Sequence, residues 1–371
     1  MDYRTILEQI QSPKAFDAFV NENMKNSTYQ IGWDKFMDVE YEASKSFQAA
    51  TAEYAAAAVG SIIDAQSGRP KRDLPPIGEI AGTLARMGDE WQLPNDLLER
   101  YYFMERRFRD KQHSMSEGQA QAEYAKIVKY LFDPYERAAI APHRRILAMF
   151  LEGLSTGSIS LTKTTNDGGV VWNTSLPTGI EVSVLPKGDK VWSEANIATM
   201  DVIKTLTDIC DKAEEKGRTV QKFYVSPKTA SLICRSTKLA ELIGLQSGRI
   251  KTSGNPVLSR NLLNEYLTAV DLPVIEVINE KGMYTNGTAF NMFADDRVTA
   301  VCADKVAVCK VSDPLELVDP VPNKVYTQYN DNLVSQWRND NGRYVACEMW
   351  AFPVFTGKND AFIVNVAEVE Q

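Results

Sequence analysis

The chain has 371 residues, of which 44% are hydrophobic and 24% are charged, and its formal net charge is −8. This composition is that of a globular chain with a substantial core, and the length fits roughly two or three domains. The acidic balance argues against a protein that wraps nucleic acid over its whole surface, because that function requires clustered lysine and arginine.

Cysteine usage and hydropathy indicate the compartment in which the protein acts. The five cysteines are scattered and never form a C-x-x-C pair, so we expect reduced, buried thiols. No apolar stretch approaches the roughly 20 residues of a membrane helix, and the start, Met-Asp-Tyr-Arg-Thr-Ile-Leu, lacks the apolar region of a secretory signal. We therefore expect a protein that stays in the compartment where it is made and has no membrane partner.

The first quarter of the chain predicts two extended appendages. Residues 1–43 combine short amphipathic pieces with polar breaks, which is typical of an arm. An Ala-rich stretch then leads to residues 66–76, whose glycine, proline and charge indicate an exposed tip. The return limb, 77–84, is short and interrupted by glycine, so we expect a β-hairpin that cannot bury both faces alone and needs a partner surface.

Two helices follow. Pro94-Asn95-Asp96 signals the start of a helix over 97–110, and a second start follows at Ser116. Apolar residues keep helical spacing from there to Leu154, although Pro134 and Pro142 predict a kink or a division. Gly153 and Gly157 predict the end of this long helix.

Beyond residue 157 the pattern changes to strands mixed with shorter helices. We expect helices over 197–216 and from Pro227 onward, because apolar residues share one face and Pro227 can open a helix. The elements do not follow a regular β-α-β rhythm, so the predicted fold class is α+β. The expected strands are 158–161, 169–172, 180–184, 222–226, 274–277, 290–293, 298–302, 344–355 and 361–366.

A search for catalytic, cofactor and metal motifs finds none. His113 and His143 are thirty residues apart, outside any H-E-x-x-H or G-x-S-x-G motif, and we interpret His143 as a residue on the helix surface. No glycine-rich segment has the spacing of a phosphate loop, and Asp295-Asp296 is better interpreted as a turn than as a metal site. We therefore predict no catalytic, cofactor or metal site and no enzyme activity.

The sequence leaves two functional alternatives open, an enzyme without a familiar motif and a nucleic-acid-binding module. One is a soluble metabolic enzyme of unrecognised α+β fold, in which residues 222–302 would form a ligand pocket. The other is a nucleic-acid-binding module that uses the basic run 105–111 and Arg144-Arg145, and its DNA affinity would depend strongly on salt. The simpler interpretation of 105–111 is a solvated helix face.

Three stretches carry a family resemblance through their order along the chain. They are 148–159, where the long helix leads into strands, 221–230 (Gln-Lys-Phe-Tyr-Val-Ser-Pro-Lys-Thr-Ala), and a closing pattern over 292–298, 326–343 and 349–353 (Met-Trp-Ala-Phe-Pro). Together they resemble the major capsid proteins of tailed phages, specifically the lambda-type family with the Hong Kong 97-type fold. The resemblance covers nearly the whole chain.

The resemblance implies a domain organisation and a function. Residues 1–43 would be the N-terminal arm, 44–95 the extended loop, 96–197 the peripheral domain with its spine helix, 198–320 the axial domain, and 321–371 the return to the peripheral domain with the C-terminal strands. The implied function is self-assembly into pentamers and hexamers of an icosahedral shell that encloses double-stranded DNA.

Partners and contact residues follow from the same resemblance. The implied partners are other copies of the chain, portal, scaffolding and decoration proteins, and packaged DNA contacted without sequence preference. The protein would be made in the cytoplasm of the host bacterium and end in the virion, without covalent cross-links. We expect the subunit contacts to include Ile62 and Ile63 beside the loop tip, Arg69, Lys71 and Arg72 on it, and Trp33 in the arm; core or merely solvated roles are the alternatives for these residues.

Overall fold

The computed structural model describes residues 5–27, 29–52, 77–162, 174–184, 190–246, 258–284 and 287–367. Its helices are α1 (Ile6–Gln9), α2 (Pro13–Met24), α3 (Asn95–Lys111), α4 (Glu117–Thr156), α5 (Val202–Glu215), α6 (Pro227–Cys234), α7 (Thr237–Gln246), α8 (Arg260–Ala269) and α9 (Leu315–Val318). Short 3-10 turns cover Gln112–Ser114 and Glu194–Asn196.

The strands of the N-terminal half are β1 (Met37–Tyr41), β2 (Ser46–Ala52), β3 (Ile77–Thr83), β4 (Ala85–Met87), β5 (Glu90–Pro94), β6 (Ser158–Leu161), β7 (Thr174–Pro177) and β8 (Glu181–Val184). Those of the C-terminal half are β9 (Lys222–Val225), β10 (Val274–Val277), β11 (Lys281–Met283), β12 (Ala289–Asn291), β13 (Arg297–Val301), β14 (Ala307–Ser312), β15 (Val325–Tyr329), β16 (Asn332–Asn339), β17 (Gly342–Val354) and β18 (Ala361–Asn365). The predicted α+β class is confirmed. The predicted strand 169–172 lies outside the described residues.

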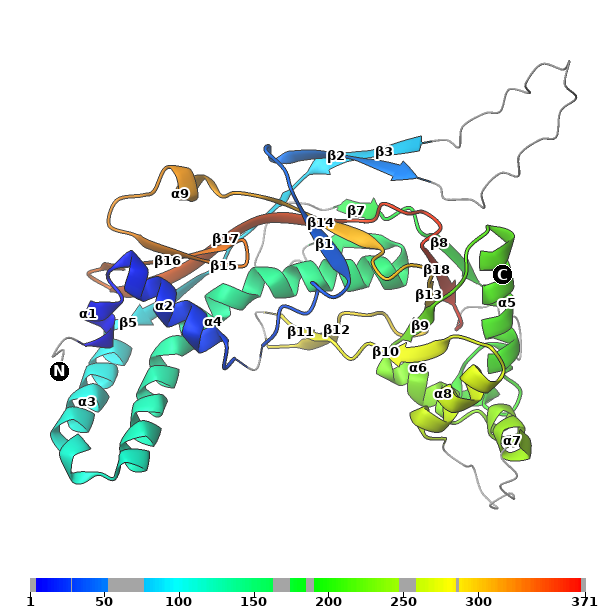
Figure 1. The fold of residues 1–371 in the computed structure, drawn as a ribbon, viewed down its shortest axis with the longest axis horizontal. Coiled ribbons are helices and arrows are strands. Elements are labelled where there is room, and N and C mark those ends of the chain that lie inside the picture. Colours follow the sequence, from blue (N-terminus) through cyan, green and yellow to red (C-terminus); the bar gives the residue numbers. More distant parts are fainter. Residues whose placement is uncertain are drawn as a thin grey trace, which may run out of the picture.

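A larger sheet is built around the long strand β17. Within the described residues its order is β1-β14-β17-β16-β15, and β4 and β5 also pair with β17. Among the described strands of this sheet, only β1 joins in parallel, pairing with β14. The helix α4 packs against one face of this sheet (Figure 1), and the shared core includes Phe150 stacked on Phe355 at 5.5 Å between ring centroids.

The helix α4 begins and ends where local chemistry directs it. The Ser116 side chain accepts a hydrogen bond from the Gln119 backbone N–H, and the Ser116 backbone N–H donates to the Gln119 side-chain oxygen, which is a capping box. Gly157 takes the left-handed conformation at the C-terminal end, with φ 77°. Pro134 and Pro142 lie inside one continuous helix, so the predicted division does not occur, whereas the bend visible in Figure 1 agrees with the predicted kink.

A smaller sheet lies at the other end of the molecule. Its order in the described residues is β10-β9-β13-β18-β8, and helices α5, α6 and α8 contact it or pack beside it (Figure 1). The apolar face of α5 buries Val202, Leu206, Ile209 and Ala213 in the core of this unit. The sequence predicted a helix over 197–216 with Ile203, Leu206, Ile209 and Ala213 on its apolar face. The last three are buried, whereas Ile203 is only partly buried and the helix begins at Val202.

Three strands lie in the opposite sheet from the one that the predicted domain boundaries imply. We expected 198–320 to form one domain, yet β14 pairs with β17 in the larger sheet. We expected 96–197 and 321–371 to belong to the peripheral domain, yet β8 and β18 pair with each other in the smaller sheet, where β18 also pairs with β13. The two units therefore exchange strands, because backbone pairing partners are chosen by the tertiary structure.

The N-terminal arm is docked on its own chain. Helices α1 and α2 bury apolar residues against the N-terminal half of α4, where Phe16 meets Tyr135 edge to face at 5.7 Å. Thr5 and Ser12 cap the two helices. The arm thus contributes to the core of the subunit.

Candidate assembly surfaces

The hairpin of β2 and β3 projects from the body of the molecule (Figure 1). The strands pair antiparallel from Ser46 opposite Thr83 to Ala52 opposite Ile77, so the predicted hairpin is confirmed for these residues. The loop tip lies outside the described residues, and so do Ile62, Ile63, Arg69, Lys71 and Arg72, whose contacts stay a prediction.

The hairpin is anchored at its root by an aromatic contact. Phe47 is 4% exposed and stacks on Phe352 of β17, with 6.1 Å between ring centroids. Gly82, which pairs with Phe47 across the hairpin, has no room for a side chain, because a Cβ there would lie 2.9 Å from the Phe47 ring. The root is therefore part of the core of the subunit.

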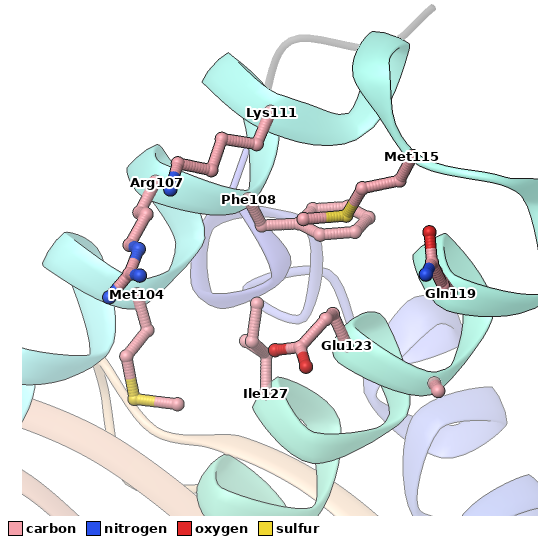
Figure 2. A pocket seen from close by; sticks show the side chains of 9 residues that line it. Met104, Arg107, Phe108, Lys111, Met115, Gln119, Glu123 and Ile127 are labelled. Atoms are coloured by element: carbon pink, nitrogen blue, oxygen red, sulfur yellow. The ribbon is translucent and has the colours of Figure 1, made fainter.

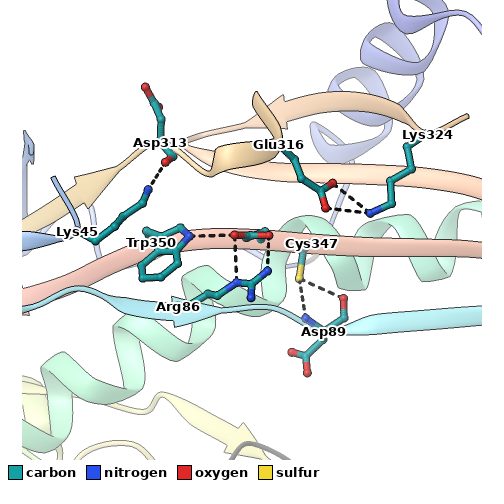
Figure 3. A network of polar contacts seen from close by, with 9 residues as sticks. Lys45, Arg86, Asp89, Asp313, Glu316, Lys324, Cys347 and Trp350 are labelled. Carbon is teal, nitrogen blue, oxygen red and sulfur yellow. Dashed lines mark hydrogen bonds and ion pairs between the residues drawn. The ribbon is translucent and has the colours of Figure 1, made fainter. Parts of the chain in front are cut away.

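A polar network ties both ends of the hairpin to β17 (Figure 3). Arg86, which follows the hairpin, donates two hydrogen bonds to Glu348, at 3.1 and 2.9 Å. Glu348 also accepts from the Trp350 indole at 2.9 Å, and burial opposes its ionisation, but these hydrogen bonds hold its pKa below the ordinary value. Lys45, which precedes the hairpin, lies over the Trp350 ring at 4.8 Å and donates to the Asp313 carbonyl. The network therefore fixes the direction in which the hairpin leaves the body.

A second surface, which we call the α9 knob, consists of residues 313–321. Its apolar side chains point to water: Leu315 is 70% exposed, Val318 80% and Val321 43%. Behind them, Lys324 donates to both carboxylate oxygens of Glu316, at 3.0 and 3.1 Å (Figure 3). Sequence reasoning missed this knob, although its signal is visible as a Leu-Glu-Leu-Val run enclosed by prolines.

A third surface is the helical groove, an open cavity of about 540 Å³ between α3 and α4 (Figure 2). Apolar side chains form much of its lining, and two cations and one carboxylate lie among them. The sequence predicted both helices but not the space between them. The groove is lined by Met104, Arg107, Phe108, Lys111, Met115, Gln119, Ala122, Glu123 and Ile127.

Two residue predictions are corrected together. Trp33 is 3% exposed, so its side chain belongs to the subunit core and the prediction that it contacts a neighbour is wrong. Its indole Nε1 donates to Nδ1 of His143 at 3.3 Å. His143 is fully buried, not on the helix surface, and its Nε2 meets the Tyr329 carbonyl at 3.2 Å. Burial lowers the pKa of His143 to about 4, so the ring is neutral at pH 7.

Several basic residues of the nucleic-acid hypothesis form contacts within the chain. Arg109 forms an ion pair with Glu105 at 2.9 Å along α3. Arg106, Arg107 and Lys111 are exposed, which agrees with a solvated helix face, whereas Glu105 is buried. Arg144 donates to Glu280 at 2.9 Å and to the Lys281 carbonyl at 2.6 Å. Burial lowers the pKa of Arg145. The pair at 144–145 is therefore a structural element rather than an open basic face.

Metal-ligand clusters and membrane-spanning helices are both absent from the described residues. Within them, no cluster of three or more His, Cys, Asp or Glu side chains could hold a metal ion. Asp296 lies in a turn with φ 60° and pairs with Lys228 at 3.3 Å, as the turn interpretation of Asp295-Asp296 predicts. The cysteines are free thiols, and four are buried. None of the described helices is long and apolar enough to cross a bilayer.

Comparison with known proteins identifies the fold. No protein-family model matches the chain, and no curated protein sequence does. Among solved structures, the chain is similar to a protein assigned as the capsid protein of a prophage in Escherichia coli CFT073, with a TM-score of 0.57 and 13% identity over 96% of this chain and 99% of that one.

Two assembled particles also resemble the chain at lower scores. The mature capsid of bacteriophage PhiM1 has a TM-score of 0.45 and 11% identity over 93% of this chain and 89% of that one. The capsid of the myovirus XM1 has a TM-score of 0.43 and 12% identity over 91% and 93% of the two chains. The likeness to the prophage protein extends over both sheets and the helices between them, and this chain therefore has the α+β fold of the Hong Kong 97-type phage capsid proteins.

Proposed function

We propose that this chain is the major capsid protein of a tailed phage or prophage, a structural subunit that assembles with copies of itself. Pentamers and hexamers of the chain would form an icosahedral shell around double-stranded DNA. The observation that carries the proposal is the projecting β2–β3 hairpin, whose described contacts with the body lie at its root, on a fold shared with a prophage capsid protein over 96% of this chain.

The physical argument concerns what a two-stranded ribbon needs. An isolated ribbon is marginal in water because it cannot bury both of its faces. Laid across a neighbouring copy, it would bury apolar area worth about 25 cal/mol per Å², less the cost of association. The rigid root supports this role, because a fixed exit direction lowers the entropy lost when the ribbon docks.

The proposal includes partners and a location. Other copies of the chain are the main partner, and portal, scaffolding and decoration proteins complete the particle. The net charge of −8 suits a shell that encloses DNA with only non-specific contact. The protein would be made in the host cytoplasm and act in the virion, and Ile62, Ile63, Arg69, Lys71 and Arg72 would contact a neighbour.

No observation favours the enzyme hypothesis. It requires a ligand pocket in 222–302, but the described part of that segment packs Phe223, Val298 and Ala300 into the core between the smaller sheet and its helices. The groove that the structure does offer lies between α3 and α4. The nucleic-acid hypothesis loses Arg144 to an internal ion pair.

Electron microscopy and sedimentation of the full chain, alone and with proteins encoded beside it, test the proposal. We expect closed shells or capsomer-sized rings. A uniform monomer or dimer under all these conditions would overturn the proposal.

A second variant tests the hairpin itself. Replacing residues 48–81 by a short Gly-Ser turn keeps the Phe47–Gly82 root and should leave a folded subunit, checked by circular dichroism, that no longer closes shells. Normal shells from this variant would remove the hairpin from the assembly mechanism.

A further inference from the structure

The α9 knob is an apolar surface that no described residue of its own chain covers. Pro314 precedes helix α9 within the knob, the Asp319 N–H donates to the Leu315 carbonyl at 2.9 Å, and the Val321 N–H donates to the Tyr326 hydroxyl at 3.0 Å. The backbone is thus held while Leu315 and Val318 stay largely in water. Clustered exposed apolar side chains on a supported turn are typical of a contact surface.

The helical groove is lined by side chains that can accept the apolar residues of the knob. Phe108 and Ile127 line it together with two methionines, whose flexible thioethers adapt to aliphatic guests (Figure 2). Arg107 and Lys111 are exposed on its α3 side. The one carboxylate of the lining, Glu123, is already paired with Lys126 at 2.7 Å.

The charges of the two surfaces are opposite. The knob carries Asp313 and Asp319, whereas Glu316 is already paired with Lys324, and cations flank the groove. No residue of α9 is among the described residues that line the groove. Both surfaces lie at the end of the molecule away from the smaller sheet (Figure 1). The knob of one copy can therefore meet the groove of a second copy.

We propose that the α9 knob of one copy inserts Leu315 and Val318 into the helical groove of the next copy, with Asp319 near Lys111. This inference rests on the proposed function, since it describes one contact of the assembly. The contact joins two different patches, so it is head-to-tail and closes into a ring of copies when the rotation permits. It is small, and adds to the hairpin contact rather than replacing it.

Thiol cross-linking within assembled particles tests the contact directly. The full-length double variant Val318→Cys/Ala122→Cys, treated with a short bis-maleimide, should give covalent dimers and longer ladders on denaturing gels. The control pairs Val318→Cys with Arg106→Cys, which lies on α3 away from the groove-lining face. Native thiols contribute little, because burial raises the pKa of the half-buried Cys210 to about 11 and the other four cysteines are buried.

A charge exchange tests the ionic part. Lys111→Glu alone and Asp319→Lys alone should each raise the protein concentration needed for assembly roughly two- to fivefold, and the double variant should restore it. Additive losses in the double variant would contradict a direct pairing.

The outcomes separate this inference from the proposed function. Closed shells with groove-specific ladders support both. Closed shells in which the groove and control pairs cross-link equally, or not at all, overturn the knob contact and leave the capsid function standing. A chain that remains monomeric with all its neighbours overturns both.

Discussion

The arm and the hairpin differ in where their apolar side chains are buried. Both are N-terminal segments that we expected to contact a neighbouring subunit. The arm places Ile6, Leu7, Phe16 and Val20 in a core shared with α3 and α4. The hairpin places Phe47 in the core and then leaves the body. A segment that buries its apolar side chains within its own chain stabilises the subunit. The hairpin, whose described contacts with the body lie at its root, instead projects away from the body.

We expect the largest effect on the free energy of unfolding from a substitution in the arm. Phe16→Ala should lower the free energy of unfolding by about 3 to 5 kcal/mol, because the ring is fully buried and its removal leaves a cavity beside Tyr135. Urea denaturation below the assembly concentration measures it. The control Phe103→Ala removes a ring that is 68% exposed and should change stability by about 0.5 kcal/mol at most. Equal effects of the two substitutions would mean that the arm is not docked.

Local signals explain why most elements were predictable. The Ser116 cap and the left-handed Gly157 delimit α4, and Pro227 opens α6 directly after the strand β9. Strand β10 has the expected bounds, and the glycines of β3 marked a hairpin limb. Each of these features is decided by neighbours within a few residues, which the sequence displays.

Distant partners explain the predictions that failed. Trp33 and His143 are 110 residues apart in the sequence, and nothing around either one indicates that they meet. Strands β14 and β18 have ordinary apolar sequences, and only tertiary pairing assigns them to different sheets. The helical groove depends on the spacing of two helices, which the packing at their bases sets. The knob could have been noticed, because apolar residues between prolines are hard to bury.

A pH-dependent effect of intermediate size is expected where the arm meets the spine helix. The Trp33 N–H can only donate, so Nδ1 of His143 must accept and Nε2–H donates to Tyr329. Burial lowers the His143 pKa from 6.5 to about 4, although the Tyr329 hydrogen bond and the Asp331 and Asp34 charges oppose this. The unfolded chain therefore binds the proton first, and stability should fall by about 3 kcal/mol as the pH falls from 6.5 to 4.

Two substitutions isolate the histidine contribution from that of the carboxylates. His143→Asn should remove this component of the pH dependence, measured as the difference in unfolding free energy between pH 7 and pH 4.5. His113→Asn, on the exposed turn after α3, should retain it. An unchanged pH dependence in His143→Asn would show that the buried ring does not control it.

We expect the smallest effect on stability at the hairpin root. It is also the effect that best distinguishes the hairpin from the arm. Arg86→Ala should cost about 1 kcal/mol or less, because the Arg86 side chain is 63% exposed and solvent screens its pair with Glu348. Arg137→Ala removes an ion pair with Asp133 on α4 in which both side chains are at least half exposed, and should cost the same or less. Only Arg86→Ala should also reduce the yield of closed shells in sedimentation, since it frees the exit direction of the hairpin. If both variants assembled equally well, the root network would serve the subunit alone, and the contrast between a docked arm and a presented hairpin would rest on Phe47.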